Sequence, residues 1–126
     1  MLAEVVIGSE MSRRIERVNQ QIKEEIAALL QRETQDPRLR GMISITNVDT
    51  SADLRNATVY VSIMGSEDEI QQTMLALRHA AGYFRREMAS RLRLRHVPEL
   101  SFKLDTSIEK GARVLEILRE IHKGEE

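Results

Sequence analysis

The stretch ISITNVDTSADLRNATVYVSIM, residues 43–64, decides the fold class of this chain of 126 residues. Apolar and polar side chains alternate in two parts of it, residues 43–48 and residues 57–64. Alternation with a period of two predicts half-buried strands, and the polar residues 50–56 between them predict a connecting turn. We therefore expect an antiparallel hairpin with one apolar face, so that helices cover only that side of the sheet.

A long helix is predicted before the hairpin, over about residues 12–33. Apolar residues recur there at spacings of three and four, which places them on one face of a helix. The Asp36-Pro37 pair should end this helix, because the residue before a proline disfavours helical conformation. Residues 1–11 are expected to form a flexible extension. The apolar stripe consists of Ile15, Val18, Ile22, Ile26 and Leu29.

Two helical segments joined by a kink are predicted after the hairpin. Ser66 and Glu69 fit a capping box, in which two side chains bind backbone amides that the helix leaves free. The apolar stripe that follows is interrupted at Gly82, and a glycine inside a helix costs about 1 kcal/mol relative to alanine. Such positions often mark a bend. The predicted kink motif consists of Ala80, Ala81 and Gly82.

The rest of the chain predicts one more strand and one more helix. Residues 100–104 alternate between apolar and polar, and residues 107–122 carry apolar side chains at spacings of three and four. Residues 123–126 are expected to be a frayed tail. The predicted order is therefore α-β-β-α-kink-α-β-α, a single α+β domain over residues 12–122.

Charge is distributed unevenly along a chain whose formal net charge is only −1. Residues 41–77 hold one base, Arg55, against five acids, whereas residues 78–103 hold seven bases against two acids. A local positive stripe of this kind indicates a phosphate-binding surface, although a solvated helix face is the alternative. Arginine forks bind phosphate oxygens at two points. The predicted RNA contacts are Arg78, Arg85, Arg86, Arg91, Arg93 and Arg95, joined by Arg13, Arg14 and Arg17 if the first helix lies beside them.

The scarcity of aromatic residues constrains how RNA would be bound. The chain has two tyrosines and two phenylalanines; Phe84 and Phe102 fit core positions, which leaves Tyr83 as the aromatic residue of the basic block. Single-stranded bases are usually held by several aromatic side chains on which they stack. We therefore expect recognition of folded RNA through its backbone and shape.

Other function classes find little support in the residues. The chain has no cysteine, its three histidines do not have the spacing of metal ligands, and its glycines do not form a phosphate-binding loop. We expect no catalytic residue, no metal and no cofactor, and a carboxylate-based hydrolase is a weak alternative. No apolar run approaches the roughly 20 residues of a membrane span, and the first ten residues carry no base. A cytoplasmic location is therefore expected.

Three longer stretches together resemble the ribosome-binding factor A family of bacterial small-subunit assembly proteins. They are RRIERVNQQIKEEIAALL at 13–30, DPRLRGMISITNVDTSADLRNATVYVSIMG at 36–65 and LRHAAGYFRREMASRLRLRHVPELSFKLDTSIEKGARV at 77–114. The resemblance implies a type II KH-like domain, with a three-stranded sheet and helices on one face. KH domains clamp the RNA backbone with a Gly-x-x-Gly loop, which this chain lacks. The family replaces that loop with the small-residue kink.

The resemblance also implies a function. It suggests binding to the immature small ribosomal subunit (30S) and its 16S rRNA, near the region processed at the 5′ end. A role in late maturation and in growth in the cold would follow, with no catalysis and no cofactor. The protein is expected to be a monomer that does not bind membranes, and an assembly GTPase is a candidate partner. The alternative is an adaptor for such a GTPase that does not itself contact RNA.

Overall fold

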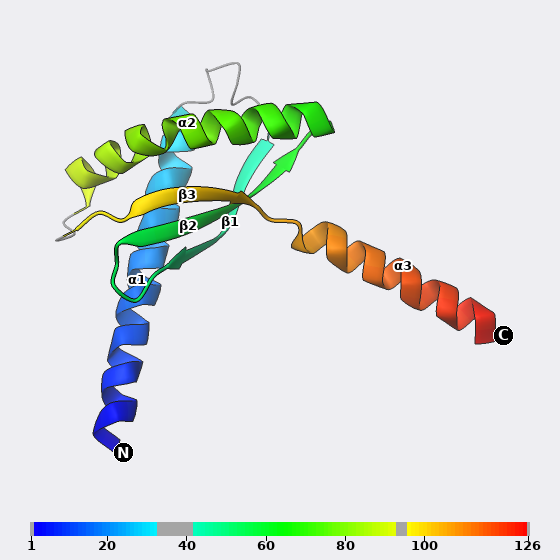
Figure 1. Cartoon of the computed structure of the whole chain (residues 1–126), viewed down its shortest axis with the longest axis horizontal. Coiled ribbons are helices and arrows are strands. Elements are labelled where there is room, and N and C mark those ends of the chain that lie inside the picture. The colour runs from blue at the N-terminus through cyan, green and yellow to red at the C-terminus, as the bar shows by residue number, and fades with distance from the viewer. Residues whose placement is uncertain (1, 33–41, 93–95, 126) are drawn as a thin grey trace.

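The computed structural model describes residues 2–32, 42–92 and 96–125. A three-stranded sheet in the order β1-β2-β3 forms the centre of the molecule (Figure 1). The predicted antiparallel hairpin is confirmed, since β1 (Met42–Thr50) and β2 (Asn56–Met64) pair in opposite directions. β3 (Glu99–Leu104) pairs parallel with β2, which requires a long crossover between the two strands.

β1 contains a bulge that explains the phase of its apolar residues. The register with β2 shifts between Ile45 and Asn47, so Thr46 is an extra residue. Because one extra residue reverses the alternation, Ile45 and Val48 both pack on the core although they are three positions apart. The bulge also directs the Thr46 hydroxyl to Asp105, just beyond β3, where Oγ1 donates a hydrogen bond of 2.6 Å to Oδ2.

α1 (Leu2–Arg32) packs against β1, and its predicted apolar stripe is buried except for Ile15, which is half-buried. The predicted start near residue 12 is wrong, because residues 2–11 continue the same helix without a proline to stop it. Independent flexibility of residues 1–11 stays a prediction. The predicted end at Asp36-Pro37 lies outside the described residues. The buried residues of α1 are Val18, Ile22, Ile26, Leu29 and Leu30.

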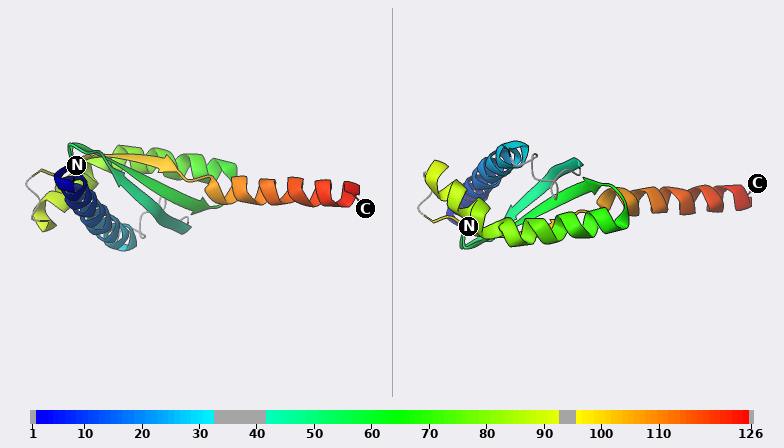
Figure 2. Two further views of the ribbon diagram at one scale, coloured as in Figure 1. Left: turned by 90° about the horizontal axis from the view of Figure 1, so that it is seen from below. Right: turned by 90° about the horizontal axis from the view of Figure 1, so that it is seen from above.

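α2 (Glu67–Arg91) is the crossover between β2 and β3, and it packs on β3. Its capping box is confirmed, because the Glu69 amide donates to Ser66 Oγ and the Ser66 amide donates to Glu69 Oε1. The helix bends in its C-terminal half, as Figures 1 and 2 show, but it continues through Gly82 without a break. A bend is therefore present where two helices were predicted. Phe84 stacks at a tilt on Phe102 of β3, with ring centroids 5.7 Å apart, and so anchors the second half.

α3 (Ser107–Glu125) leads away from the rest of the molecule (Figures 1 and 2). The helix was predicted, but its apolar stripe is not buried against the sheet. No helix in the described ranges has the length and apolar content needed to cross a membrane. The exposed apolar residues of α3 are Val114, Leu115, Ile117, Leu118 and Ile121. The α+β class and the order of the elements are as predicted.

Candidate nucleic-acid interface

α2 carries four of the nine arginines predicted to bind RNA, namely Arg78, Arg85, Arg86 and Arg91. One side of this helix is fixed on the core by Leu77, Phe84 and Met88, all fully buried. The arginines occupy other positions of the helix, so they lie at the surface. The structure divides them into two that hold other parts of the chain and two that do not. Arg93 and Arg95 lie outside the described residues.

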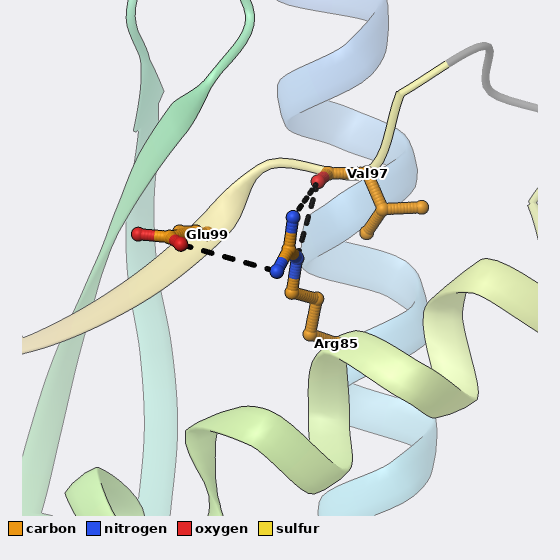
Figure 3. Close-up of polar contacts among 3 residues, drawn as sticks. All are labelled: Arg85, Val97 and Glu99. Carbon is orange, nitrogen blue, oxygen red and sulfur yellow. Dashed lines mark hydrogen bonds and ion pairs between the residues drawn. The ribbon is translucent and has the colours of Figure 1, made fainter.

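Arg85 ties α2 to the segment that enters β3. Its Nε and Nη2 both donate to the backbone carbonyl oxygen of Val97, at 3.3 and 3.2 Å, and its Nη1 lies 3.9 Å from Glu99 Oε1 (Figure 3). The side chain is nevertheless 48% exposed, and Nη1 has no hydrogen bond within the described part of the chain. Arg85 therefore has a structural role, although its side chain remains half exposed.

Arg91 ties the last turn of α2 to α1. Its Nη1 lies 3.7 Å from Glu25 Oε2, and its Nε lies 3.9 Å from Glu87 Oε2 one helical turn earlier. Glu25 Oε2 is buried and accepts no hydrogen bond from the described residues. A buried carboxylate oxygen without a nearby cation is costly, so Arg91 compensates a charge that α1 brings into the interface.

Arg78 and Arg86 are exposed and have no hydrogen bond or ion pair with any residue in the described ranges. Arg78 lies on the flank of α2 that faces β3, where it lines a hollow of about 280 Å³ with Ala81 and Ser101. Seven residues separate Arg78 from Arg85, which corresponds to about two helical turns, so the two arginines lie on the same flank. This flank beside the edge strand β3 can present cations in a row.

The arginines of α1 lie on the part of the helix that comes just before its contact with the sheet. Arg13, Arg14 and Arg17 are exposed, and Val18, which follows them, is the first buried residue in the part of α1 from residue 12 on. Asn19 accepts a hydrogen bond from the Thr50 hydroxyl at the end of β1. These arginines therefore lie near the hairpin end of the sheet. Arg91 of α2 reaches α1 further along, at Glu25, so an extension of the α2 surface by these arginines stays a prediction.

The predicted kink motif is divided between the core and the surface. Ala80 and Ala81 are half-buried and pack against the core, whereas Gly82 is exposed. A side chain added at Gly82 would meet only the end of Arg86, with Nη1 3.8 Å from the added Cβ. The small size of residues 80 and 81 thus permits close packing of α2 on the sheet, while Gly82 has no close neighbour that would exclude a methyl group.

Two basic residues that were not among the predicted contacts border a groove at the hairpin end of the sheet. Arg55 of the hairpin turn and His96 before β3 line it together with Arg85, and its volume is about 700 Å³. A signal for Arg55 existed in the sequence, because it is the single base among residues 41–77. Proximity to Arg85 could not be inferred, since it depends on the parallel pairing of β2 with β3.

Two aspartates near the sheet ends have lowered pKa values and structural partners. The Ser51 hydroxyl and the Arg55 amide donate to Asp53 and lower the pKa of its carboxyl group. The Thr46 hydroxyl, followed by Ser107, lowers the pKa of Asp105 in the same way. Each carboxylate accepts a hydrogen bond from a backbone amide, Asp53 from that of Arg55 and Asp105 from that of Ser107. In the described ranges, no cluster of three or more histidine and acidic side chains could hold a metal ion.

These observations define a class of protein. It is a small α+β domain whose bent central helix presents unpaired arginines, one of them beside an edge strand, a surface suited to phosphate groups. The chain belongs to the ribosome-binding factor A family, whose family model matches residues 14–118. The resemblance seen in the sequence is thereby confirmed.

Individual relatives agree with this assignment. Ribosome-binding factor A of Caldanaerobacter subterraneus subsp. tengcongensis is 46% identical over 116 residues, which cover 92% of this chain and 95% of the relative. The crystal structure of ribosome-binding factor A from Thermus thermophilus has a TM-score of 0.62 and 28% identity, over 71% of this chain and 94% of that one.

A further similar structure is described together with a ribosomal subunit. It is a homology model of Thermus thermophilus ribosome binding factor A fitted into the cryo-EM map of a complex with 30S. Its TM-score to this chain is 0.53 at 26% identity, over 74% of this chain and 92% of that one.

Proposed function

We propose that this protein is a maturation factor of the small ribosomal subunit. It binds immature 30S subunits and their 16S rRNA in the cytoplasm and supports late maturation and processing of the 5′ end of the rRNA precursor. It acts as a monomer without catalysis or cofactor, and it contributes to growth in the cold. An assembly GTPase is a second partner. Membership of the ribosome-binding factor A family supports this proposal.

The single observation that carries the RNA contact is the pair of unpaired arginines on α2. Arg78 and Arg86 are exposed and contact no carboxylate in the described part of the chain. A guanidinium group that stabilises nothing in the fold is available for phosphate oxygens. Phosphate contacts supply affinity and orientation but no sequence choice, which fits an interface with few aromatic side chains.

The proposal is tested by co-sedimentation with immature and mature 30S subunits at several salt concentrations. We expect tighter binding to immature subunits, and a slope of log affinity against log salt of about −3 to −5 if about five phosphates are contacted. Binding that does not change with salt would contradict the electrostatic mechanism. Retention of a partner from nuclease-treated extract, without binding to subunits, would favour the GTPase adaptor instead.

The arginines are tested in the same assay with a double variant, Arg78→Ala with Arg86→Ala. Each lost phosphate contact should reduce affinity several-fold and lower the salt slope by about one. Thermal stability should not change, because neither side chain has a partner in the described residues. Arg113→Ala is the matched control, since Arg113 is an exposed arginine on α3. Equal binding of the double variant and the wild type would exclude these arginines from the interface.

A further inference from the structure

The groove at the hairpin end is built by three segments that are distant in sequence. Arg55 comes from the β1–β2 turn, Arg85 from α2 and His96 from the segment before β3. A volume of about 700 Å³ lies in the range of pockets that hold small ligands or single nucleotide units. The groove is open to solvent and adjoins the flank of α2 that carries the proposed RNA contacts.

The hairpin turn holds the backbone of Arg55 in a fixed position. The Arg55 amide donates to Asp53 Oδ1 at 3.1 Å, and the Arg55 carbonyl oxygen accepts a hydrogen bond of 2.8 Å from the Glu99 amide. The backbone N–H and C=O of Arg55 are therefore both hydrogen-bonded, the N–H within the turn and the C=O to β3. The Ser51 side chain supports the turn further by donating to Asp53 and accepting from the Asn56 amide.

The turn also contains backbone strain. Leu54 has a φ of +61°, a left-handed conformation that is unfavourable for a residue with a branched side chain. Strain of this kind costs about 1–3 kcal/mol and persists where the surrounding structure imposes it, often at functional sites. Here the strained residue directly precedes Arg55.

The charges around the groove leave the Arg55 guanidinium available. Asp53, the nearest acid in sequence, accepts hydrogen bonds from Ser51 and from the Arg55 amide, and the charge of the Arg55 side chain also lowers the pKa of its carboxyl group. Within the described residues, no carboxylate oxygen forms an ion pair with the Arg55 side chain. Glu99, the second acid of the groove, lies 3.9 Å from Arg85. Among the acids that the structure describes, a group with several negative oxygens would therefore compete for Arg55 only with Asp53, which lies beyond ion-pair distance, and would meet His96 in the lining of the same groove.

We infer that this groove binds a backbone phosphate of the rRNA between Arg55 and His96, with Arg85 forming its wall. This inference rests on the proposed function and extends it from α2 to the β1–β2 turn. The turn would act as a second anchor, separate from the Arg78 and Arg86 surface. Its ligand is the phosphodiester backbone of RNA, and no base is selected because the described lining of the groove contains no phenylalanine, tyrosine or tryptophan.

The first test compares Arg55→Gln with the wild-type chain in binding to immature 30S subunits. We expect affinity to fall about three- to tenfold and the salt slope to decrease by about one, which is the effect of losing one phosphate contact. Arg55→Lys should recover part of the affinity because it keeps the charge without the fork. Arg113→Gln on α3 is the matched control and should bind like the wild type.

The outcomes separate this inference from the proposed function. Suppose that Arg55→Gln binds with wild-type affinity and salt slope while the Arg78 and Arg86 double variant binds weakly. Phosphate binding in the groove is then overturned, and the proposed function stands. If the wild-type chain does not bind subunits at all, both are overturned. A drop in melting temperature of Arg55→Gln would show a structural role, and the second test then decides.

The second test identifies the occupant directly. The chain has no cysteine, so a single one introduced by Ala52→Cys in the exposed turn can carry a photo-crosslinking group without altering Arg55. On immature subunits we expect a cross-link to rRNA that nuclease digests. A cross-link to a ribosomal protein would overturn the inference in favour of an acidic peptide. Gly111→Cys on α3 is the control, since nothing lies within 4 Å of that position.

Discussion

The arginines of α2 differ in what they contact, although the sequence presents them as one basic block. Arg85 binds the Val97 carbonyl and Arg91 approaches the buried Oε2 of Glu25 in α1, while Arg86 has no partner in the described residues. Spacing along a helix predicts which residues are exposed. It does not predict partners such as Glu25, because these depend on how distant elements pack. For this reason the sequence could locate the surface but could not distinguish its structural arginines from its unpaired ones.

We expect Arg85→Ala to destabilise the fold. Loss of two charge-assisted hydrogen bonds to a half-exposed carbonyl should reduce the free energy of unfolding by about 1 kcal/mol. The melting temperature should fall by about 4 °C for a chain of this size. Arg86→Ala is the neighbouring control and should melt like the wild type. Equal melting temperatures for both variants would mean that the Val97 contact adds nothing to stability.

A pH effect is expected from Asp105, which joins the end of β3 to the bulge of β1. Hydrogen bonds from Thr46 and Ser107 hold the pKa of Asp105 below the usual value of 3.8. Because the folded pKa is lowered, the stabilisation is fully present above pH 3.8 and is lost as the pH falls through the lowered value.

The variant Thr46→Val tests this effect. Its Asp105 pKa should rise toward 3.8, as followed by NMR titration of the carboxyl group. It should also be less stable than the wild type at neutral pH, by a difference that shrinks as acid protonates Asp105 in both proteins. A difference that stays constant into strong acid would mean that Thr46 acts through packing and not through the carboxylate.

At the scale of the elements, the strands were predicted well and the helix boundaries less well. Period-two alternation is a local signal, so β1, β2 and β3 lie within about two residues of their predicted ranges. Gly82 suggested a break in α2 because of its weak helix propensity. Propensity amounts to about 1 kcal/mol here, whereas burial of Phe84 and Met88 contributes several, so the helix continues.

Replacement of Gly82 by alanine should therefore stabilise the protein. The added Cβ would lie 3.8 Å from Arg86 Nη1, which is ordinary contact, and alanine favours the helix by about 0.5–1 kcal/mol. Urea denaturation should show this gain in the free energy of unfolding. Gly111→Ala is the control, and it should raise helicity without changing the global transition. A loss of stability in Gly82→Ala would indicate that the bend needs a glycine.

At the scale of the whole molecule, the sequence predicted the central domain but not the position of α3. An amphipathic stripe predicts that a helix has an apolar side, yet it does not say whether the same chain covers that side. Leu115 and Leu118 are about half exposed. The cooperative unit that buries a core therefore ends near β3, and α3 adds little to it.

A chain shortened to end at Lys110 should consequently keep the stability of the full protein. It retains Asp105 and Ser107, whose contacts close the end of β3. We expect the melting temperature to change by less than about 3 °C, while helical circular dichroism decreases by the contribution of α3. A large loss of stability, compared with the full chain as control, would show that α3 packs on the domain in solution.

The outward course of α3 affects how the protein behaves as a particle in solution. A compact chain of this length has a radius of gyration of about 14 Å, but a helix of 19 residues adds a projection of about 28 Å. A monomer of this shape would diffuse slowly and elute early from a gel-filtration column. An early peak would thus resemble a dimer, and the true mass has to come from light scattering or sedimentation equilibrium.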